Sequence, residues 1–277
     1  MILPVTVVVP VRNEEKKLSA CLQAIGNRFA EVVVADSGST DRTCEIALNS
    51  GATVLDFKWD GKFPKKRNWV LQTHKFRTPW VLFLDADELV TDEFIDELHR
   101  VLVGTPHAGF WISFTNYFMG RPLRHGDVFR KLALFRIGAG EYERFPEQLW
   151  SNLDMEVHEH PVLEGTVGDI HAKLDHDLYR GLHHYIAKHN EYSTWETNRF
   201  CWLSSAPSAE WEKLTSRQKF KYRNLDRWWL AWLYFLVSYL LKRGFLDGSA
   251  GWHFNRLKKR YFDDIRAKIL ELVKRRG

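Results

Sequence analysis

The first hundred residues alternate between apolar, strand-like runs and stretches with apolar residues at helical spacing, and this alternation limits the fold more than any other feature. The strand-like runs cover residues 6–10, 31–36, 52–57 and 80–87. Continuous apolar strands separated by helices are typical of a parallel sheet that is covered on both faces. The sequence therefore predicts an α/β fold with right-handed crossovers.

After residue 105 the pattern changes. Residues 109–118, 131–137 and 155–165 have strand character without intervening helices, which predicts an antiparallel or mixed extension of the sheet. From Leu178 the pattern is helical almost to the end of the chain. Residues 204–210, SSAPSAE, have the composition of a junction.

We therefore expect one domain over residues 1–205 and a helical tail over residues 206–277. The formal charge is divided unevenly along the chain. Residues 1–212 carry 23 Lys and Arg against 30 Asp and Glu, whereas residues 213–277 carry 17 against 5. A basic tail on an acidic body predicts an anionic partner for the tail.

Composition favours a packed globular protein, because 45% of the 277 residues are hydrophobic and 27% are charged. The three cysteines are scattered and form no CxxC pair, which argues against a disulfide framework or a cysteine zinc site and favours a reducing compartment. The apolar first ten residues lack a basic start and a cleavage site, so we expect a buried strand there and not a signal peptide.

Polar residues gather where the predicted parallel strands end. PVRNEE (10–15), DSGSTD (36–41) and DADE (85–88) each follow an apolar run. Ligands of open parallel sheets bind beyond the carboxyl ends of the strands. Asp85 and Asp87 lie two apart in extended chain and so point to one side, where carboxylate oxygens suit Mg²⁺ or Mn²⁺.

Two further groups complete the predicted site. Asp36, followed by Gly38 and Ser39, offers an acceptor on a tight turn, suited to a base or a ribose. Residues 61–68, GKFPKKRN, bring four cations to the same rim, where a diphosphate needs neutralising. Taken alone, this basic stretch is more typical of a solvated helix start. DADE alone is equally typical of a turn followed by a helix, where Glu88 would only favour the start of that helix.

Together these motifs resemble glycosyltransferase family 2, the inverting GT-A enzymes. PVRNEE, ADSGSTD, KKRN and LFLDADE occur in the family's order and at similar spacing across the first 90 residues. The resemblance implies a GT-A fold, a UDP-linked sugar donor and a divalent Mn²⁺ or Mg²⁺ cofactor. It assigns the nucleotide sugar to Pro10, Asn13, Glu14, Asp36, Arg67, Asp85 and Ala86, and the metal to Asp87.

Inverting transfer to a hydroxyl needs a general base. In MEVHEHP (155–161) the resemblance favours Glu159 as that base, with Glu156 in reserve. The alternative is that Glu159 only pairs with an arginine. HEHP is not HExxH, and the following proline disfavours a helix, so a zinc hydrolase is not expected.

A second metal ligand is expected just beyond the sheet, where family members often carry a histidine. His176 in LDHDLYR fits that place, while His183, His184 and His189 on the next helix are expected to face solvent or to pack. This segment, together with GFLDGSAGW (244–252), resembles the lipopolysaccharide-core β-1,4-glucosyltransferases. That resemblance implies transfer of a sugar, glucose in the first instance, to a lipopolysaccharide-core or other lipid-linked glycan.

The tail contains fourteen mostly apolar residues, Trp228 to Leu241, that as a helix span about 21 Å, short of the roughly 30 Å of a bilayer core. Trp, Tyr and flanking cations are typical of an interfacial element. We expect peripheral attachment to the anionic inner face of the cell membrane in the cytoplasm. The alternative is that these helices close the protein's own core or a homodimer interface.

Three other functions compete with this hypothesis. A polyprenyl-phosphate glycosyltransferase has an acceptor oxygen that is already anionic and needs no strong base. A nucleic-acid-binding protein could use the basic tail, but the continuous apolar run does not suit a phosphate-tracking surface, so no nucleic acid partner is expected. A catalytically dead scaffold is disfavoured by the intact carboxylates.

Overall fold

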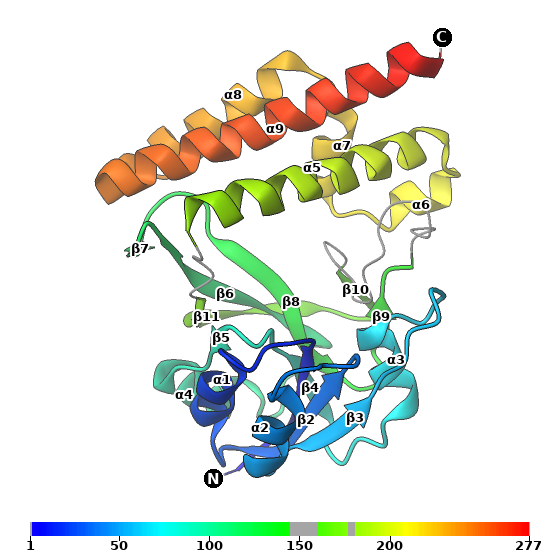
Figure 1. The fold of residues 1–277 in the computed structure, drawn as a ribbon, viewed down its shortest axis with the longest axis vertical. Helices are drawn as coiled ribbons and strands as arrows, with labels where there is room; N and C mark the ends of the chain where they lie inside the picture. Colours follow the sequence, from blue (N-terminus) through cyan, green and yellow to red (C-terminus); the bar gives the residue numbers. More distant parts are fainter. Residues whose placement is uncertain (1, 145–159, 177–180, 277) are drawn as a thin grey trace. The chain divides into compact units, whose positions relative to one another are not determined.

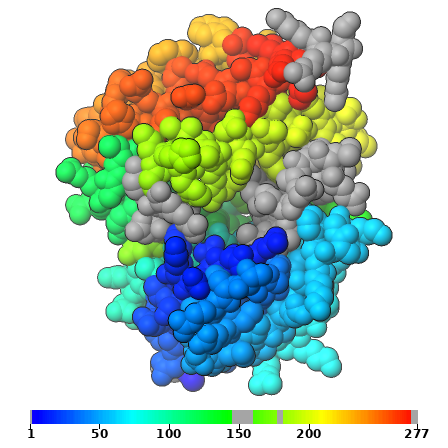
Figure 2. Space-filling model, viewed as in Figure 1, coloured from blue at the N-terminus to red at the C-terminus, as the bar shows by residue number. Residues whose placement is uncertain are grey.

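The computed structural model describes residues 2–144, 160–176 and 181–276. The chain forms two compact units. Unit 1 contains Met1–Thr115 and Phe129–Asp177, and unit 2 contains Asn116–Val128 and Leu178–Gly277. Figure 1 shows the elements of each unit, and Figure 2 shows the same view with all atoms.

A parallel sheet forms the first half of unit 1, as the alternating pattern predicts. Its strands are β1 (Leu3–Val11), β2 (Phe29–Asp36), β3 (Thr53–Asp56) and β4 (Trp80–Phe83), in the order β3-β2-β1-β4. Val8 pairs with Val33 on one side and with Phe83 on the other, so β1 lies at the centre. The carboxyl ends of β1, β2 and β4 therefore lie together at one edge.

The sheet continues with antiparallel pairing. β4 pairs with β8 (Phe129–Arg136), β8 with β6 (Gly109–Phe118), and β11 (Val167–His176) pairs with the short β5 (Glu88–Leu89). The full order is β3-β2-β1-β4-β8-β6-β11-β5, and β7 (Arg121–Leu123) pairs with β6. β9 (Gly140–Tyr142) and β10 (Pro161–Leu163) form a separate pair. The predicted mixed α/β sheet is confirmed.

Helices cover both faces of the sheet, since the side chains of β1 alternate between two apolar clusters. Val5, Val7 and Val9 join the cluster that contains residues of α1 (Leu18–Ile25), α2 (Thr43–Asn49) and α4 (Asp92–Val101). Val8 joins the opposite cluster, with Val70 of α3 (Lys66–Thr73). This two-sided burial explains why β1 reads as a continuous apolar run.

Unit 2 is mainly helical, as the pattern after Leu178 predicts. It contains α5 (Leu182–Ser205), α6 (Ser208–Glu212), α7 (Ser216–Asn224), α8 (Trp228–Leu236), the π-helical turn η2 (Val237–Leu241), the 3₁₀ turn η3 (Gly244–Asp247) and α9 (Gly248–Arg276). The long α9 packs against both α5 and α8 (Figure 1). Leu203, Leu230, Ile265 and Ile269 form the centre of its core.

The boundary expected at residue 205 coincides with the end of α5, but α5 packs with the helices of unit 2, so the compact helical unit begins before residue 206. As a division of function, that boundary stays a prediction. Among the described residues, no helix combines the length and the apolar character needed to cross a bilayer.

Candidate active site

The turn after β2 is built around the carboxylate of Asp36. Its Oδ2 accepts hydrogen bonds from the backbone N–H groups of Gly38 and Ser39, both at 2.9 Å, and the Ser39 hydroxyl donates to Oδ1. Gly38 has φ of 78°, a left-handed conformation that glycine adopts without a steric penalty. Asp36 is therefore fixed, with 5% of its surface exposed, at the edge where a nucleotide is expected.

The turn after β1 is tied to the turn after β2. Asn13 has φ of 55°, its N–H donates to the Ser39 hydroxyl at 2.8 Å, and its Oδ1 accepts from the Thr40 N–H at 2.8 Å. The Glu14 N–H donates to the Thr43 hydroxyl at 2.8 Å. Pro10 lies buried in β1 just before these residues. Four of the seven residues assigned by resemblance to the nucleotide sugar thus lie at one edge, and three of them, Asn13, Glu14 and Asp36, are joined to its turns by hydrogen bonds.

Lys66 differs from the solvated rim cation that the sequence suggests. Its ammonium donates to the Val11 carbonyl at 2.9 Å and to the Ser37 hydroxyl at 2.7 Å, and only 1% of the residue is exposed. The cation therefore braces the ends of β1 and β2 from inside. Arg67, the next residue, contacts Asp85 in the second part of the site, which follows β4.

The second part of the site follows β4, where Asp85 is held between two cations. Arg67 donates from Nη2 to Asp85 Oδ1 at 2.8 Å, and the Lys131 ammonium contacts both Asp85 Oδ2 and Glu88 Oε1. Lys131 also lies 5.4 Å from the ring centre of Phe114 and 5.8 Å from that of Phe129. The cation is thus enclosed by two carboxylates and two aromatic rings.

Glu88 is a buried member of this network and not the start of a helix, which corrects the expectation from sequence. Its side chain is 0% exposed, it lies in β5, and its Oε2 accepts from the Asp85 N–H at 3.0 Å. The next helix begins at Asp92, and the Thr91 side chain caps it. Glu88 therefore fixes the backbone of the DxD turn.

Asp87 and His176 come together although 89 positions separate them in the chain. His176 is the last residue of β11, which the sequence did not predict as a strand, and pairs with Glu88 of β5. Its Nε2 lies 3.6 Å from Asp87 Oδ1 and 3.8 Å from Glu88 Oε1. The Lys17 ammonium lies 3.2 Å from Asp87 Oδ2. Ala86 is buried between the two aspartates.

Burial and charge act in opposite directions on the three carboxylates. Burial alone would raise the pKa of Asp85, but Lys131 and Arg67 outweigh it and hold that pKa well below its usual range. Burial would likewise raise the pKa of Asp87, yet His176 and Lys17 keep it low. The pKa of Glu88 is raised by burial and by Asp85, despite Lys131. Asp85 and Asp87 are thus ionised at neutral pH.

Asp87 and His176 have the chemistry of a partial metal site. The His176 Nε2 is buried, lies 3.6 Å from Asp87 Oδ1 and makes no hydrogen bond to any of the described residues. A buried imidazole nitrogen without a partner is costly unless a ligand satisfies it. Within the described residues, no group of three or more His, Cys, Asp and Glu side chains could hold a metal. An imidazole nitrogen and a carboxylate oxygen are ligands that a divalent cation accepts, so the pair could hold such a cation together with oxygens of a substrate and water.

Sequence reasoning missed Lys131 altogether. It lies in an apolar run, KLALFRI, that gives no sign of facing the DADE turn. The contact arises because β8 pairs with β4 and β6, a strand order that local sequence does not reveal. Glu159 and Glu156 lie outside the described residues, and of the HEHP stretch only His160 and Pro161 are described.

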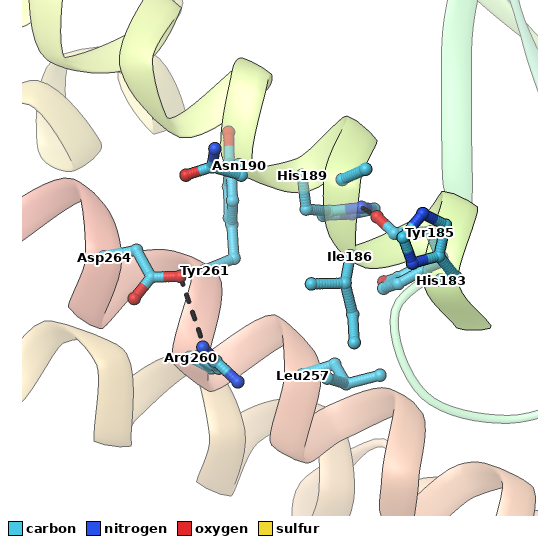
Figure 3. Close-up of a pocket in the computed structure, with 10 residues that line it drawn as sticks. His183, Tyr185, Ile186, His189, Asn190, Leu257, Arg260, Tyr261 and Asp264 are labelled. Carbon is cyan, nitrogen blue, oxygen red and sulfur yellow. Dashed lines mark hydrogen bonds and ion pairs between the residues drawn. The ribbon is translucent and has the colours of Figure 1, made fainter.

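A separate cavity of about 330 Å³ lies between α5 and α9 of unit 2 (Figure 3). Tyr185 and His189 point into it from α5, and Arg260 and Asp264 of α9 form an ion pair at 3.8 Å. The His189 ring stacks on Tyr185 at 3.9 Å, which confirms a packing role for that histidine.

The mixed sheet, the polar site at its strand ends and the helical extension define the chain as a protein of the GT-A class. Residues 6–152, more than half of the chain, match the family described as Glycosyl transferase family 2. The chain therefore belongs to glycosyl transferase family 2.

Individual curated relatives have modest sequence identity to this chain or match only a part of it. The lipopolysaccharide core biosynthesis glycosyltransferase LpsC of Rhizobium meliloti is 29% identical over 201 residues, 69% of this chain and 70% of LpsC. Other curated relatives match 30% to 33% of this chain and only 22% to 30% of their own length.

Two solved structures represent the structural comparisons. S. aureus TarS 1-349 is 15% identical, with a TM-score of 0.45 over 99% of this chain and 92% of that one. Glucosyl-3-phosphoglycerate synthase from Mycobacterium tuberculosis, in complex with Mn²⁺, UDP and glucosyl-3-phosphoglycerate, is 22% identical. Its TM-score is 0.32, over 42% of this chain and 44% of that one.

Proposed function

We propose that this protein is an inverting, metal-dependent glycosyltransferase that moves a sugar, glucose in the first instance, from a UDP-sugar to a hydroxyl of a lipopolysaccharide-core or other lipid-linked glycan. The observation that carries the proposal is the Asp87–His176 pair beside the Asp85–Arg67 ion pair, in a chain of family 2. The name of LpsC supports the acceptor class.

The nucleotide is bound along the edge formed by the ends of β1 and β2. Asp36 receives the base, and Pro10, Asn13 and Glu14 line the pocket, which the shared hydrogen bonds of these turns keep preformed. Arg67 and Asp85, with the buried Ala86 behind them, position the ribose and the adjacent phosphate. A preformed site lowers the ordering cost of donor binding.

Asp87 and His176 would hold Mn²⁺ or Mg²⁺. When bound, the cation supplies positive charge to the diphosphate as the sugar departs. The protein's own contribution is to aim the His176 Nε2, which the rings of Phe114 and Phe129 confine at 5.5 and 5.8 Å between centres. The Lys17 ammonium forms an ion pair with the other oxygen of Asp87 and so orients the carboxylate.

Glu159 is proposed as the general base that takes the proton of the acceptor hydroxyl, with Glu156 as the reserve candidate. A polyprenyl phosphate acceptor would need no such base, so Glu159→Gln separates the two acceptor classes. We expect a loss of turnover of at least about hundredfold with a hydroxyl acceptor. Turnover within about twofold of wild type would exclude Glu159 as the base.

We place the enzyme in the cytoplasm, peripheral to the inner face of the cell membrane, because acceptors of this class are carried by lipids. A homodimer stays a prediction.

The function is tested by screening UDP- and GDP-sugars with Mn²⁺ or Mg²⁺ and measuring the release of free nucleotide. One UDP-sugar should support release that depends on the metal. Asp87→Ala should abolish it, whereas Asp96→Ala, which removes an exposed carboxylate of α4, should leave it unchanged. Full activity of Asp87→Ala would refute the metal assignment.

A further inference from the structure

Unit 2 exposes an unusual amount of apolar surface around α8 and η2. Nine of the twenty exposed large apolar side chains among the described residues lie between residues 228 and 252. We call six of them the docking face: Trp228, Trp232, Leu233, Leu236, Leu240 and Leu241. Trp228 is 67% exposed and Leu241 is 77% exposed. Exposed large apolar side chains gathered on successive turns of α8 and η2 indicate an interaction site.

The docking face is the side of α8 that the core does not use. Leu230, Ala231 and Ser238 are buried, and the first two join the core cluster that contains Ile265 of α9. Trp228, Trp232, Leu236 and Leu240 follow one another at spacings of four and lie on another side. The helix is therefore apolar on two sides, and only one is enclosed in the core of unit 2; on the other, Trp232 contacts Phe235 and Lys259 and is still 49% exposed.

A cluster of cations adjoins this face. Lys242 lies 2.7 Å and Arg217 3.3 Å from the carboxylate of Asp127, and Lys258 contacts the same carboxylate. Three cations thus share one anion, which leaves an excess of two positive charges. The side chains of Arg217 and Lys242 are 66% and 44% exposed, so this excess faces solvent.

The cations and the apolar face meet in one cavity of about 350 Å³. Arg217, Lys242 and Asp127 form its polar wall, while Phe220, Leu233 and Val237 form its apolar wall. Leu233 belongs to the docking face, so the cavity opens where apolar and positive surfaces join. Such a cavity matches an amphiphilic anion, with a phosphate at one end and hydrocarbon at the other.

We propose that the docking face and this cavity hold unit 2 on a bilayer that contains anionic phospholipids, with a lipid phosphate beside Arg217 and Lys242. Tryptophan and leucine enter the interfacial region, and the excess charge attracts the leaflet. The proposal deepens the peripheral location given above, but it concerns binding alone. A second copy of the chain suits this surface less well, because a symmetric contact would bring both sets of cations together.

The experiment measures binding of the full chain to vesicles of phosphatidylcholine, alone or mixed with phosphatidylglycerol in equal amounts. Wild type should bind the mixed vesicles and not the neutral ones. Arg217→Gln with Lys242→Gln should weaken that binding by about tenfold to thirtyfold. The control, Arg42→Gln with Lys58→Gln, removes two cations from unit 1 whose side chains are 71% and 87% exposed, and should leave binding within about twofold.

Trp232→Ser with Leu240→Ser tests the apolar contribution and should also weaken binding at least about tenfold. Circular dichroism establishes that each variant is folded, and nucleotide release from the UDP-sugar without vesicles should be unchanged. A protein that binds vesicles but releases no nucleotide would thus refute the proposed function and leave the docking surface standing.

Three outcomes would overturn the proposal. Equal losses in the Arg217/Lys242 variant and its control would mean that charge acts diffusely and not through the cavity. Saturable binding of inorganic phosphate without vesicle binding would identify a site for free phosphate. A wild-type dimer that Trp232→Ser with Leu240→Ser converts to monomer, again without vesicle binding, would assign the face to a second copy.

Discussion

The two units contain ionic networks with opposite charge balances. In unit 1 the described contacts join three carboxylates, Asp85, Asp87 and Glu88, to three cations, Lys131, Arg67 and Lys17, so the formal charges cancel. In unit 2 three cations surround the single carboxylate of Asp127. A balanced network suits a metal–diphosphate complex, whose own charges largely cancel, whereas an unbalanced one attracts a bare anion.

The two networks also differ in which of their charged side chains are exposed to solvent. In unit 1 both partners of the Lys131–Glu88 ion pair are largely enclosed, since the side chain of Glu88 is 0% exposed and that of Lys131 is 22% exposed. In unit 2 the anion is enclosed and two of its cations reach solvent. The first arrangement fixes a geometry, and the second presents charge at a surface.

The largest expected effect concerns the metal pair of unit 1. His176→Ala and Asp87→Ala should each weaken Mn²⁺-dependent UDP binding by about tenfold to a hundredfold or more, because each removes one of the two proposed protein ligands of the metal. Calorimetry with UDP, with and without Mn²⁺, measures the change. UDP binding in either variant that equals the wild type would contradict a metal at this position.

The next effect concerns Lys131. Lys131→Met should lower the free energy of unfolding by more than about 2 kcal/mol, because Asp85 and Glu88 lose their shared cation. Urea denaturation gives the stability, and steady-state kinetics should show a raised KM for the donor. Lys131→Arg, which keeps the charge, should recover part of both. A Lys131→Met protein as stable as wild type would show that the balanced network is dispensable.

In unit 2, Asp127→Asn sharpens the comparison because it should change two properties in opposite directions. We expect stability to fall by about 1 to 2 kcal/mol, since Lys258 and Lys242 lose an ionic partner. Binding to phosphatidylglycerol vesicles should increase, because the excess positive charge grows. Weaker vesicle binding by a folded Asp127→Asn protein would contradict the assignment of the cation cluster.

The smallest effect is a pH dependence of unit 2. Burial lowers the pKa of His189, which contacts Tyr185 and Tyr261 and has Lys188 and Lys258 nearby. The unfolded chain then binds a proton more readily below about pH 6.5, so stability should decline as pH falls through that value. Thermal unfolding at about pH 7.5 and pH 5.5 measures this decline. His189→Gln should reduce it, and an unchanged slope would exclude His189 as its source.

Local sequence predicted the parts of the fold that depend on local patterns. The parallel strands appeared as continuous apolar runs because both faces are covered, and β6 was predicted with its observed bounds. β11 was missed because its polar and histidine-rich sequence lacks a strand pattern, and only its partner strands specify it. Pairing of distant strands is a property of the whole chain.

The same distinction holds for the site. Asp87 and His176 could be named in advance because family motifs carry them, and the structure brings them within 3.6 Å. The role of Glu88 was predicted wrongly because a carboxylate before a helix usually favours the start of that helix, whereas here Glu88 pairs with the half-buried Lys131 of β8. The site residue that sequence could not supply, Lys131, reaches the turn through strand order alone.

Because the ammonium of Lys66 is buried, chemical labelling can measure the opening of the turns after β1 and β2, where we propose that the nucleotide binds. An acylating reagent should modify Lys58, whose side chain is 87% exposed, long before Lys66, which is 1% exposed and donates to the Val11 carbonyl. Mass spectrometry of partly labelled protein would measure how fast modified Lys66 accumulates, and this rate reports how often the turns after β1 and β2 open. A ligand that stabilises these turns should slow the acylation of Lys66, so the labelling rate of this one lysine can report donor binding.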